Sequence, residues 1–509
     1  MICQFGEQSM SLSINDSNPQ EPDLSRSRSA AKGRFLPSIL SGGLWIVAAK
    51  IVSQLSQVAT FFVAARMLSP AEFGLFAFIS AIAMLLVVVA EGGWAEFIMK
   101  ARDGDDCFDQ VATLSLFTGG LFTALGLVAA VVLYAFRGNE AQGALLALFS
   151  CWMLPSALTA AFDGKLVASG CLRQRAIVRV GGELSGLITA ILLLSLYGHA
   201  SALAAAKVTS QLVLLIGSAR VVMRLPRLRL TRPVFAEVMV FSRQIVGNRL
   251  VVFLGSYSGT LVVGSFLGIA DAGLYRAAER VVAVVSELLA EPVRSLSWIV
   301  FRRAHEQGAG ATGAAGARFV LALLAIAAPM YLGLAQISEP VVRLMLGEPW
   351  MPAASIIPFL CVRQLLLSPG YINEASLSVV GRIGYRLPVT LLNVAVSLAV
   401  VVVVARLGLQ ELAIAQCCTA VLALATCVGL QARIAGVNWL AICKGVVLII
   451  SPSSLIMVVA VALVGQEFSG SLAWKTLGVL QIVTGALAYT ATLAILFALN
   501  RRLRRTLRA

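Results

Sequence analysis

LSPAEFGLFAFISAIAMLLVVVAEGG, residues 68–93, is a short polar turn followed by a long apolar run. About 20 helical residues are needed to cross roughly 30 Å of hydrocarbon, and the apolar part of this stretch is close to that length. The acidic residue and the glycine after the proline are typical of a turn that starts a helix. The stretch therefore predicts a membrane-spanning helix entered through a tight turn.

The same pattern of apolar runs separated by short polar turns continues from Ile39 to Leu499. The chain has 509 residues, of which 59% are hydrophobic and 13% charged, so it has too little polar surface for a water-soluble globule. We predict an all-α, polytopic membrane protein with about fourteen transmembrane helices. The expected spans are 39–64, 75–98, 111–135, 142–162, 177–197, 201–222, 240–264, 272–299, 318–338, 353–380, 387–407, 411–433, 441–464 and 474–499.

The distribution of Lys and Arg predicts the orientation of these helices. With the N-terminus inside, about 28 cations fall in cytoplasmic segments and about five in external connections, as expected for both termini in the cytoplasm. We interpret the net charge of +15 as orientation and contact with anionic lipid head groups in the bilayer, and not as a nucleic-acid site.

An internal repeat divides the chain. Residues 68–76, LSPAEFGLF, match residues 267–275, LGIADAGLY, at an offset of 199 positions. Six expected helices separate the copies, so the repeats run parallel to each other and predict two six-helix lobes. The expected organisation is a disordered cytoplasmic tail (1–38), an N-lobe (39–222), a cytoplasmic linker (223–239), a C-lobe (240–433), two further helices (434–499) and a basic cytoplasmic tail (500–509).

The cysteines and histidines do not predict a metal or catalytic site. None of the nine Cys forms a CxxC motif, and most lie in apolar runs. His199 and His305 lie in different connections, with no Cys or carboxylate at ligand spacing. We expect neither a cofactor nor an enzyme.

Charged residues inside the expected spans are the candidate site, because a charge at the bilayer centre costs roughly 2.5–3.5 kcal/mol and has to line water or meet a partner. Lys50 lies near the middle of its span, and the repeat offset carries it onto Arg249. Two cations at equivalent positions would suit an anion held from both sides. The alternative is that each cation pairs privately with a Glu.

One span is charged along a whole face. Arg363 and Glu374 are expected to share a face in another span, at i and i+11. Because Arg forms paired hydrogen bonds with phosphate oxygens, these cations favour a phosphate or diphosphate group, although sugar carboxylates or an anionic drug would also suit them. In the span that is charged along a whole face, 272–299, the charged residues are Arg276, Arg280, Glu287, Glu291 and Arg294.

Three motifs resemble the opening of bacterial polysaccharide transporters, the Wzx-type flippases: Gly43-Leu44-Trp45, residues 65–76 (ARMLSPAEFGLF) and Glu91-Gly92-Gly93. The resemblance implies a two-lobed fold shared with multidrug-extrusion (MATE) exporters and lipid II flippases. It implies that undecaprenyl-diphosphate-linked oligosaccharide crosses the inner membrane by alternating access. Glu91 departs from the family's pattern, so no role is carried over to it.

Carried over to this chain, the resemblance implies a cavity with a set of cations. Coupling to H⁺ or Na⁺ would use a second set, of carboxylates. Expected partners are the lipid-linked oligosaccharide, a polysaccharide polymerase and a chain-length regulator. A multidrug or lipid II exporter is the alternative, and a membrane polymerase or glycosyltransferase is a more distant one. The cavity cations are Lys50, Arg249, Arg280 and Arg363, and the carboxylates for ion coupling are Glu287, Glu291 and Glu374.

Overall fold

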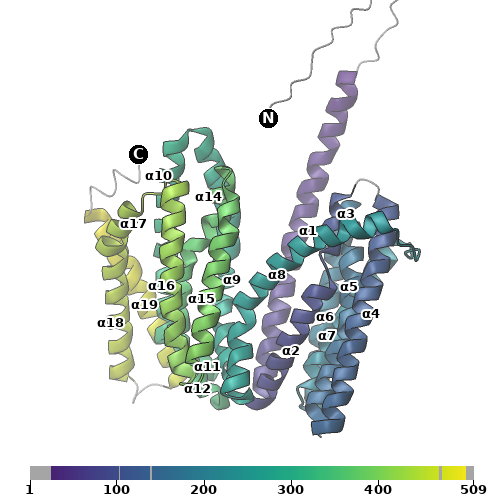
Figure 1. The fold of residues 1–509 in the computed structure, drawn as a ribbon. Helices are drawn as coiled ribbons and strands as arrows, with labels where there is room; N and C mark the ends of the chain where they lie inside the picture. Colours follow the sequence, from purple (N-terminus) through teal and green to yellow (C-terminus); the bar gives the residue numbers. More distant parts are fainter. Residues whose placement is uncertain (1–23, 102–103, 138–139, 469–472, 500–509) are drawn as a thin grey trace, which may run out of the picture.

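The protein is a helical bundle whose two lobes converge at one end (Figure 1). The computed structural model describes residues 24–101, 104–137, 140–468 and 473–499, and these ranges contain helices but no strand. This confirms the all-α class. Both expected tails overlap ranges outside the described residues, namely 1–23 and 500–509.

The described residues of the N-lobe form seven helices, with α4 packed along α5, and α6 packed along both α7 and α1. Its second span is broken between α2 and α3, where Gly92 and Gly93 adopt left-handed backbone conformations with φ of 53° and 79°. The first helix begins earlier than the expected span, at Leu24. The helices are α1 (Leu24–Met67), α2 (Pro70–Ala90), α3 (Trp94–Lys100), α4 (Gly104–Arg137), α5 (Glu140–Ala168), α6 (Leu172–Tyr197) and α7 (Ser201–Val222).

The remaining helices form the C-lobe and the C-terminal pair. Short 3₁₀ segments lie within or just before the expected spans 353–380 and 387–407. A π-helical turn (Val446–Ile450) interrupts the expected span 441–464. The helices are α8 (Arg232–Phe266), α9 (Ile269–Glu306), α10 (Ala309–Gln336), α11 (Ser338–Met345), α12 (Met351–Ala354), α13 (Ile357–Leu367), α14 (Asn373–Val379), α15 (Arg386–Val404), α16 (Leu409–Ile434), α17 (Trp439–Gly445), α18 (Ser451–Phe468) and α19 (Trp474–Leu499).

Every expected span coincides with a helix or a broken helix. Within the described ranges, 12 helices are long and apolar enough to cross a membrane, and a pair bent by 48° raises this to 13. The expected span that this count leaves out, 272–299, is α9, which has 38 residues and packs against α2, α8 and α10. Its charged face excludes it from a test based on apolar composition.

The lobes meet through an apolar core at the end that carries α11 and α12 (Figure 1). Trp350 is fully buried there, donates a hydrogen bond from Nε1 to the Ala65 carbonyl at 2.7 Å, and packs edge-on against Phe73. The Arg66 guanidinium also donates to the backbone carbonyl of Leu344 at the end of α11. These contacts hold the end of α1 in the N-lobe against α11 and α12 in the C-lobe.

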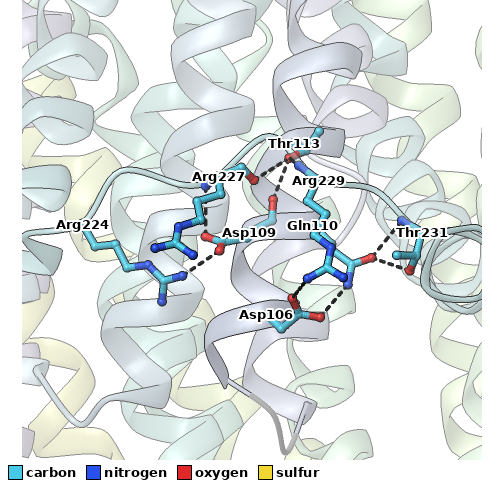
Figure 2. A network of polar contacts seen from close by, with 8 residues as sticks. All are labelled: Asp106, Asp109, Gln110, Thr113, Arg224, Arg227, Arg229 and Thr231. Carbon is cyan, nitrogen blue, oxygen red and sulfur yellow. Dashed lines mark hydrogen bonds and ion pairs between the residues drawn. The ribbon is translucent and has the colours of Figure 1, made fainter.

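The segment between α7 and α8 is fixed to the first part of α4 (Figure 2). Buried Asp109 accepts a hydrogen bond from the Arg224 guanidinium at 2.6 Å and another from the Arg227 backbone N–H at 3.2 Å. The Thr113 hydroxyl accepts from the Arg229 N–H at 3.1 Å. Irregular backbone needs partners for its N–H groups, and α4 provides them. The linker is therefore attached to the N-lobe.

Candidate functional site

A polar cavity of about 480 Å³ lies in the C-lobe between α8, α9 and α13. Three arginines and two glutamates line it, together with the side chains of Ser286 and Gln364. The side chains of the three arginines are only 20–27% exposed, so water reaches them partially. The charged residues are Arg276, Glu279, Arg280, Glu287 and Arg363.

Glu279 is the carboxylate at the centre of the cavity wall. Arg276 lies 3.2 Å from its Oε2, and Arg363 reaches across from α13 to 3.6 Å from its Oε1. The Tyr275 hydroxyl donates to Oε1 at 3.0 Å and itself accepts from the Gln416 amide at 2.7 Å. One carboxylate thus orients two guanidinium groups from different helices toward the same space.

A second set of contacts joins the two lobes beside the cavity. Arg280 pairs with Glu287 at 2.9 Å, and the Gln54 amide from α1 donates to the other oxygen of Glu287. One helical turn further along, Lys50 on α1 pairs with Glu291 on α9 at 2.7 Å. Polar side chains of α1 therefore bridge from the N-lobe to the charged face of α9.

The charged face of α9 lies where the sequence predicted it. Three of its five members line the cavity, and Glu291 continues the row to Lys50. Arg294 is 3.8 Å from Glu291 and lies 5.6 Å from the centre of the Tyr371 ring. Such a row is too costly in lipid, and here every member meets an opposite charge or the cavity.

The structure does not join Lys50 and Arg249 into one anion site. Arg249 on α8 pairs with Glu91 at 3.2 Å and with Glu96 at 2.6 Å, at the break between α2 and α3. Lys50 pairs with Glu291 on α9. The expectation of two facing, unpaired cations is therefore wrong, and the alternative of private Glu partners is what the structure contains.

Arg363 and Glu374 do not share a site either. The 3₁₀ segment Ser368–Ile372 separates α13 from α14 and changes the angular register on which the i, i+11 relation depended. Arg363 reaches the cavity, whereas Glu374 pairs with Arg386 at 2.9 Å. Glu374 thus lies apart from the other two carboxylates in the expected coupling set.

Glu279 is the site residue that the sequence analysis missed. A signal was present, because it lies three residues after Arg276 and ion pairs at that spacing are favourable on a helix. Its contact with Arg363 had no signal, since 84 positions separate the two residues in the chain.

The arrangement is suited to binding an anion. The cavity wall carries one more positive than negative charge, and Lys50 and Arg294 with Glu291 add one further positive charge beside it. Paired guanidinium groups from α9 and α13 can each form two hydrogen bonds to phosphate oxygens. In the described part of the chain, no group of three or more His, Cys, Asp and Glu side chains could hold a metal ion.

Comparison with known proteins agrees with this architecture. A relative, the succinoglycan biosynthesis transport protein ExoT of Rhizobium meliloti (strain 1021), is 24% identical over 332 residues, 64% of this chain and 66% of that protein. The match thus spans just under two thirds of the relative's length.

Two solved structures share the fold. The lipid II flippase MurJ in an inward closed conformation superposes with a TM-score of 0.73 at 13% identity, covering 89% of this chain and 99% of MurJ. An inward-facing MATE multidrug resistance transporter gives a TM-score of 0.63 at 15% identity, covering 75% and 95%. At these identities the likeness concerns the fold.

A family model described as "Polysaccharide biosynthesis protein" matches residues 63–355, which include both copies of the repeated turn and all of α9, α11 and α12. This match covers more than half of the chain, and the protein therefore belongs to the polysaccharide biosynthesis protein family.

Proposed function

We propose that this protein is a flippase that moves a diphosphate-linked oligosaccharide on a polyprenyl carrier from the cytoplasmic to the external leaflet of the inner membrane. The observation that carries the proposal is the C-lobe cavity, where Arg276, Arg280 and Arg363 converge inside a helical bundle. The family's role in polysaccharide biosynthesis and the name of the transport relative point to the same cargo.

The geometry of the cavity suits a diphosphate group. The diphosphate would compete with Glu279 and Glu287 for the guanidinium groups, so the empty site keeps its cations paired. The saccharide would occupy hydrated space between the lobes while the polyprenyl chain stays in lipid. Both termini are cytoplasmic in this proposal, because the cations concentrate on that side.

Coupling to H⁺ or Na⁺ would act on the carboxylates that hold the cavity cations. Glu287 and Glu291 qualify because each pairs with a cation and contacts α1. Glu374 is the weaker candidate, since it pairs with Arg386 away from the cavity. A polysaccharide polymerase and a chain-length regulator are the proteins that would receive the cargo.

The chain is a transporter and not an enzyme, in keeping with its family and its transport relative. The second candidate function is export of lipid II or of drugs, favoured by the fold shared with MurJ and the MATE transporter. The cationic wall argues against cationic drugs as the main cargo, because like charges repel in a poorly hydrated cavity.

The test uses purified full-length protein in proteoliposomes that contain a polyprenyl-diphosphate disaccharide with a fluorophore on the sugar. Movement between leaflets is followed with a membrane-impermeant quencher, with and without a pH, Na⁺ or electrical gradient. We expect faster movement of this lipid than in protein-free liposomes, and no acceleration of a phospholipid with the same fluorophore. Equal rates for both lipids under all gradients would refute the proposal, and selective movement of lipid II would favour the second candidate.

A further inference from the structure

A second polar pocket lies between α11 and the α18–α19 hairpin. Its volume is about 420 Å³, within the range of about 300–1,000 Å³ typical of small-ligand sites. It lies by α11, at the end of the bundle away from the start of α1 (Figure 1), and the cation distribution assigns this end to the external side. The pocket is separate from the arginine-lined cavity and has no residue in common with it.

Its lining combines an aromatic ring with polar groups whose hydrogen-bonding capacity is unused. The Trp474 indole is half-buried, and the Arg343 guanidinium lies 5.9 Å from its centre while pairing with Glu348 at 2.9 Å. Among the described residues, the side chains of Gln336, Glu339 and Gln481 make no hydrogen bond or ion pair with the protein. Both amides and the carboxylate are therefore available to a ligand.

The Gln481 amide lies close to a glycine in the neighbouring helix. A Cβ on Gly465 of α18 would lie 2.9 Å from Nε2 of Gln481, tighter than ordinary van der Waals contact. Glycine at this position gives the amide room between α18 and α19. The pocket is thus bounded by packed helices on this side.

We propose that this pocket binds a neutral saccharide unit. Amides and a carboxylate can donate to and accept from several hydroxyls at once, and an indole offers an apolar face to the C–H groups of a sugar ring. An apolar ligand would leave these polar groups without partners, which is costly. A phosphate finds no net positive charge here, because the carboxylates of Glu339 and Glu348 offset Arg343 and Lys475, whose Nζ lies 5.5 Å from the centre of the Trp474 ring.

This inference rests on the proposed function for the source of the saccharide, which is the oligosaccharide part of the translocated lipid. The two sites divide the cargo by chemistry. The arginine-lined cavity takes the diphosphate, and the pocket at the external end takes sugar residues as they emerge.

The test is a ligand-observed NMR titration of the full-length protein in lipid nanodiscs with a panel of neutral hexose disaccharides. Glycerophosphoethanolamine and inorganic phosphate are titrated in parallel, because a lipid head group or a free anion could also occupy a pocket at this depth. We expect saturable binding of at least one disaccharide and weaker binding of both phosphate-containing probes.

Two variants and a matched control locate the binding. Gln481→Leu and Glu339→Gln should each weaken disaccharide binding about tenfold, the effect of losing one hydrogen bond of roughly 1.4 kcal/mol. Gln410→Leu changes an exposed glutamine at the start of α16, outside the pocket, and should leave binding unchanged. Glu339→Gln changes an exposed residue without altering its size, so a folding defect in Gln481→Leu would not remove the test.

The pocket proposal fails if no disaccharide binds, if neither pocket variant weakens binding, or if glycerophosphoethanolamine binds there more tightly. Flipping and binding can fail separately. Protein that moves the lipid-linked saccharide but binds no free saccharide refutes the pocket alone. Protein that binds saccharide in this pocket but moves no lipid refutes the proposed function and retains the pocket.

Discussion

Gly74 and Gly273 lie against each other where α2 of the N-lobe crosses α9 of the C-lobe. They occupy equivalent positions in the two copies of the repeated turn, 199 residues apart. A Cβ on Gly74 would overlap the Ile269 carbonyl, and one on Gly273 would overlap the Pro70 carbonyl. The repeat thus packs on itself at the interface that closes one end of the molecule.

We expect Gly74→Ala and Gly273→Ala each to open this interface. A methyl group forced against backbone costs about 1–3 kcal/mol, so the population of the closed arrangement should fall by a factor of about 5 to 150. The measurement is labelling of a cysteine introduced at the interface with a membrane-impermeant reagent. Gly333→Ala is the control, because a Cβ there meets nothing within 4 Å. Equal labelling of all three variants would contradict the prediction.

Arg363 tests the arginine-lined cavity. Arg363→Lys keeps the charge but removes the planar pair of donors, so we expect transport of the diphosphate-linked lipid to fall about tenfold or more. The proteoliposome assay measures the rate. Arg382→Lys makes the same change at an exposed residue after α14 and should have little effect. A loss shared by both variants would mean that the cavity is not the binding site.

The Lys50–Glu291 contact tests the bridge between the lobes. Both side chains are about half exposed, so the pair should contribute only about 0.2–1 kcal/mol to stability. Transport should respond more strongly, because Lys50→Glu places a carboxylate beside Glu291 and Glu287 across the lobe boundary. The double variant Lys50→Glu with Glu291→Lys should recover most of the transport rate. A double variant as inactive as the single one would show that the pairing itself is not required.

Asp109 tests the attachment of the linker. Asp109→Asn removes a buried charge that holds the Arg224 side chain and the Arg227 backbone, at an expected cost of about 1–3 kcal/mol. Trypsin should then cleave the linker about tenfold faster, because a backbone released from α4 opens locally more often and fits a protease more readily. Asp106→Asn is the matched control, since Asp106 lies on the same helix but its side chain is 56% exposed. Faster cleavage in both variants alike would contradict this account of the linker.

The sequence determined the class of the protein and most of its fold. All fourteen expected spans coincide with helices or broken helices, because the need to satisfy every backbone hydrogen bond in lipid leaves a long apolar segment little choice. The repeat offset identified the two turns that pack on each other at Gly74 and Gly273. The helical period also identified the charged face of α9, because that period is a local property of the chain.

Only the tertiary structure decided which charges meet. Local periodicity places Arg280 and Glu287 on one face, but not Arg363 opposite Glu279 or Lys50 against Glu291, since those contacts depend on how separate helices pack. The repeat related Lys50 to Arg249, yet each pairs with carboxylates on other elements. A charge inside a membrane protein takes whichever partner the packing brings within reach, and sequence distance carries no information about that choice.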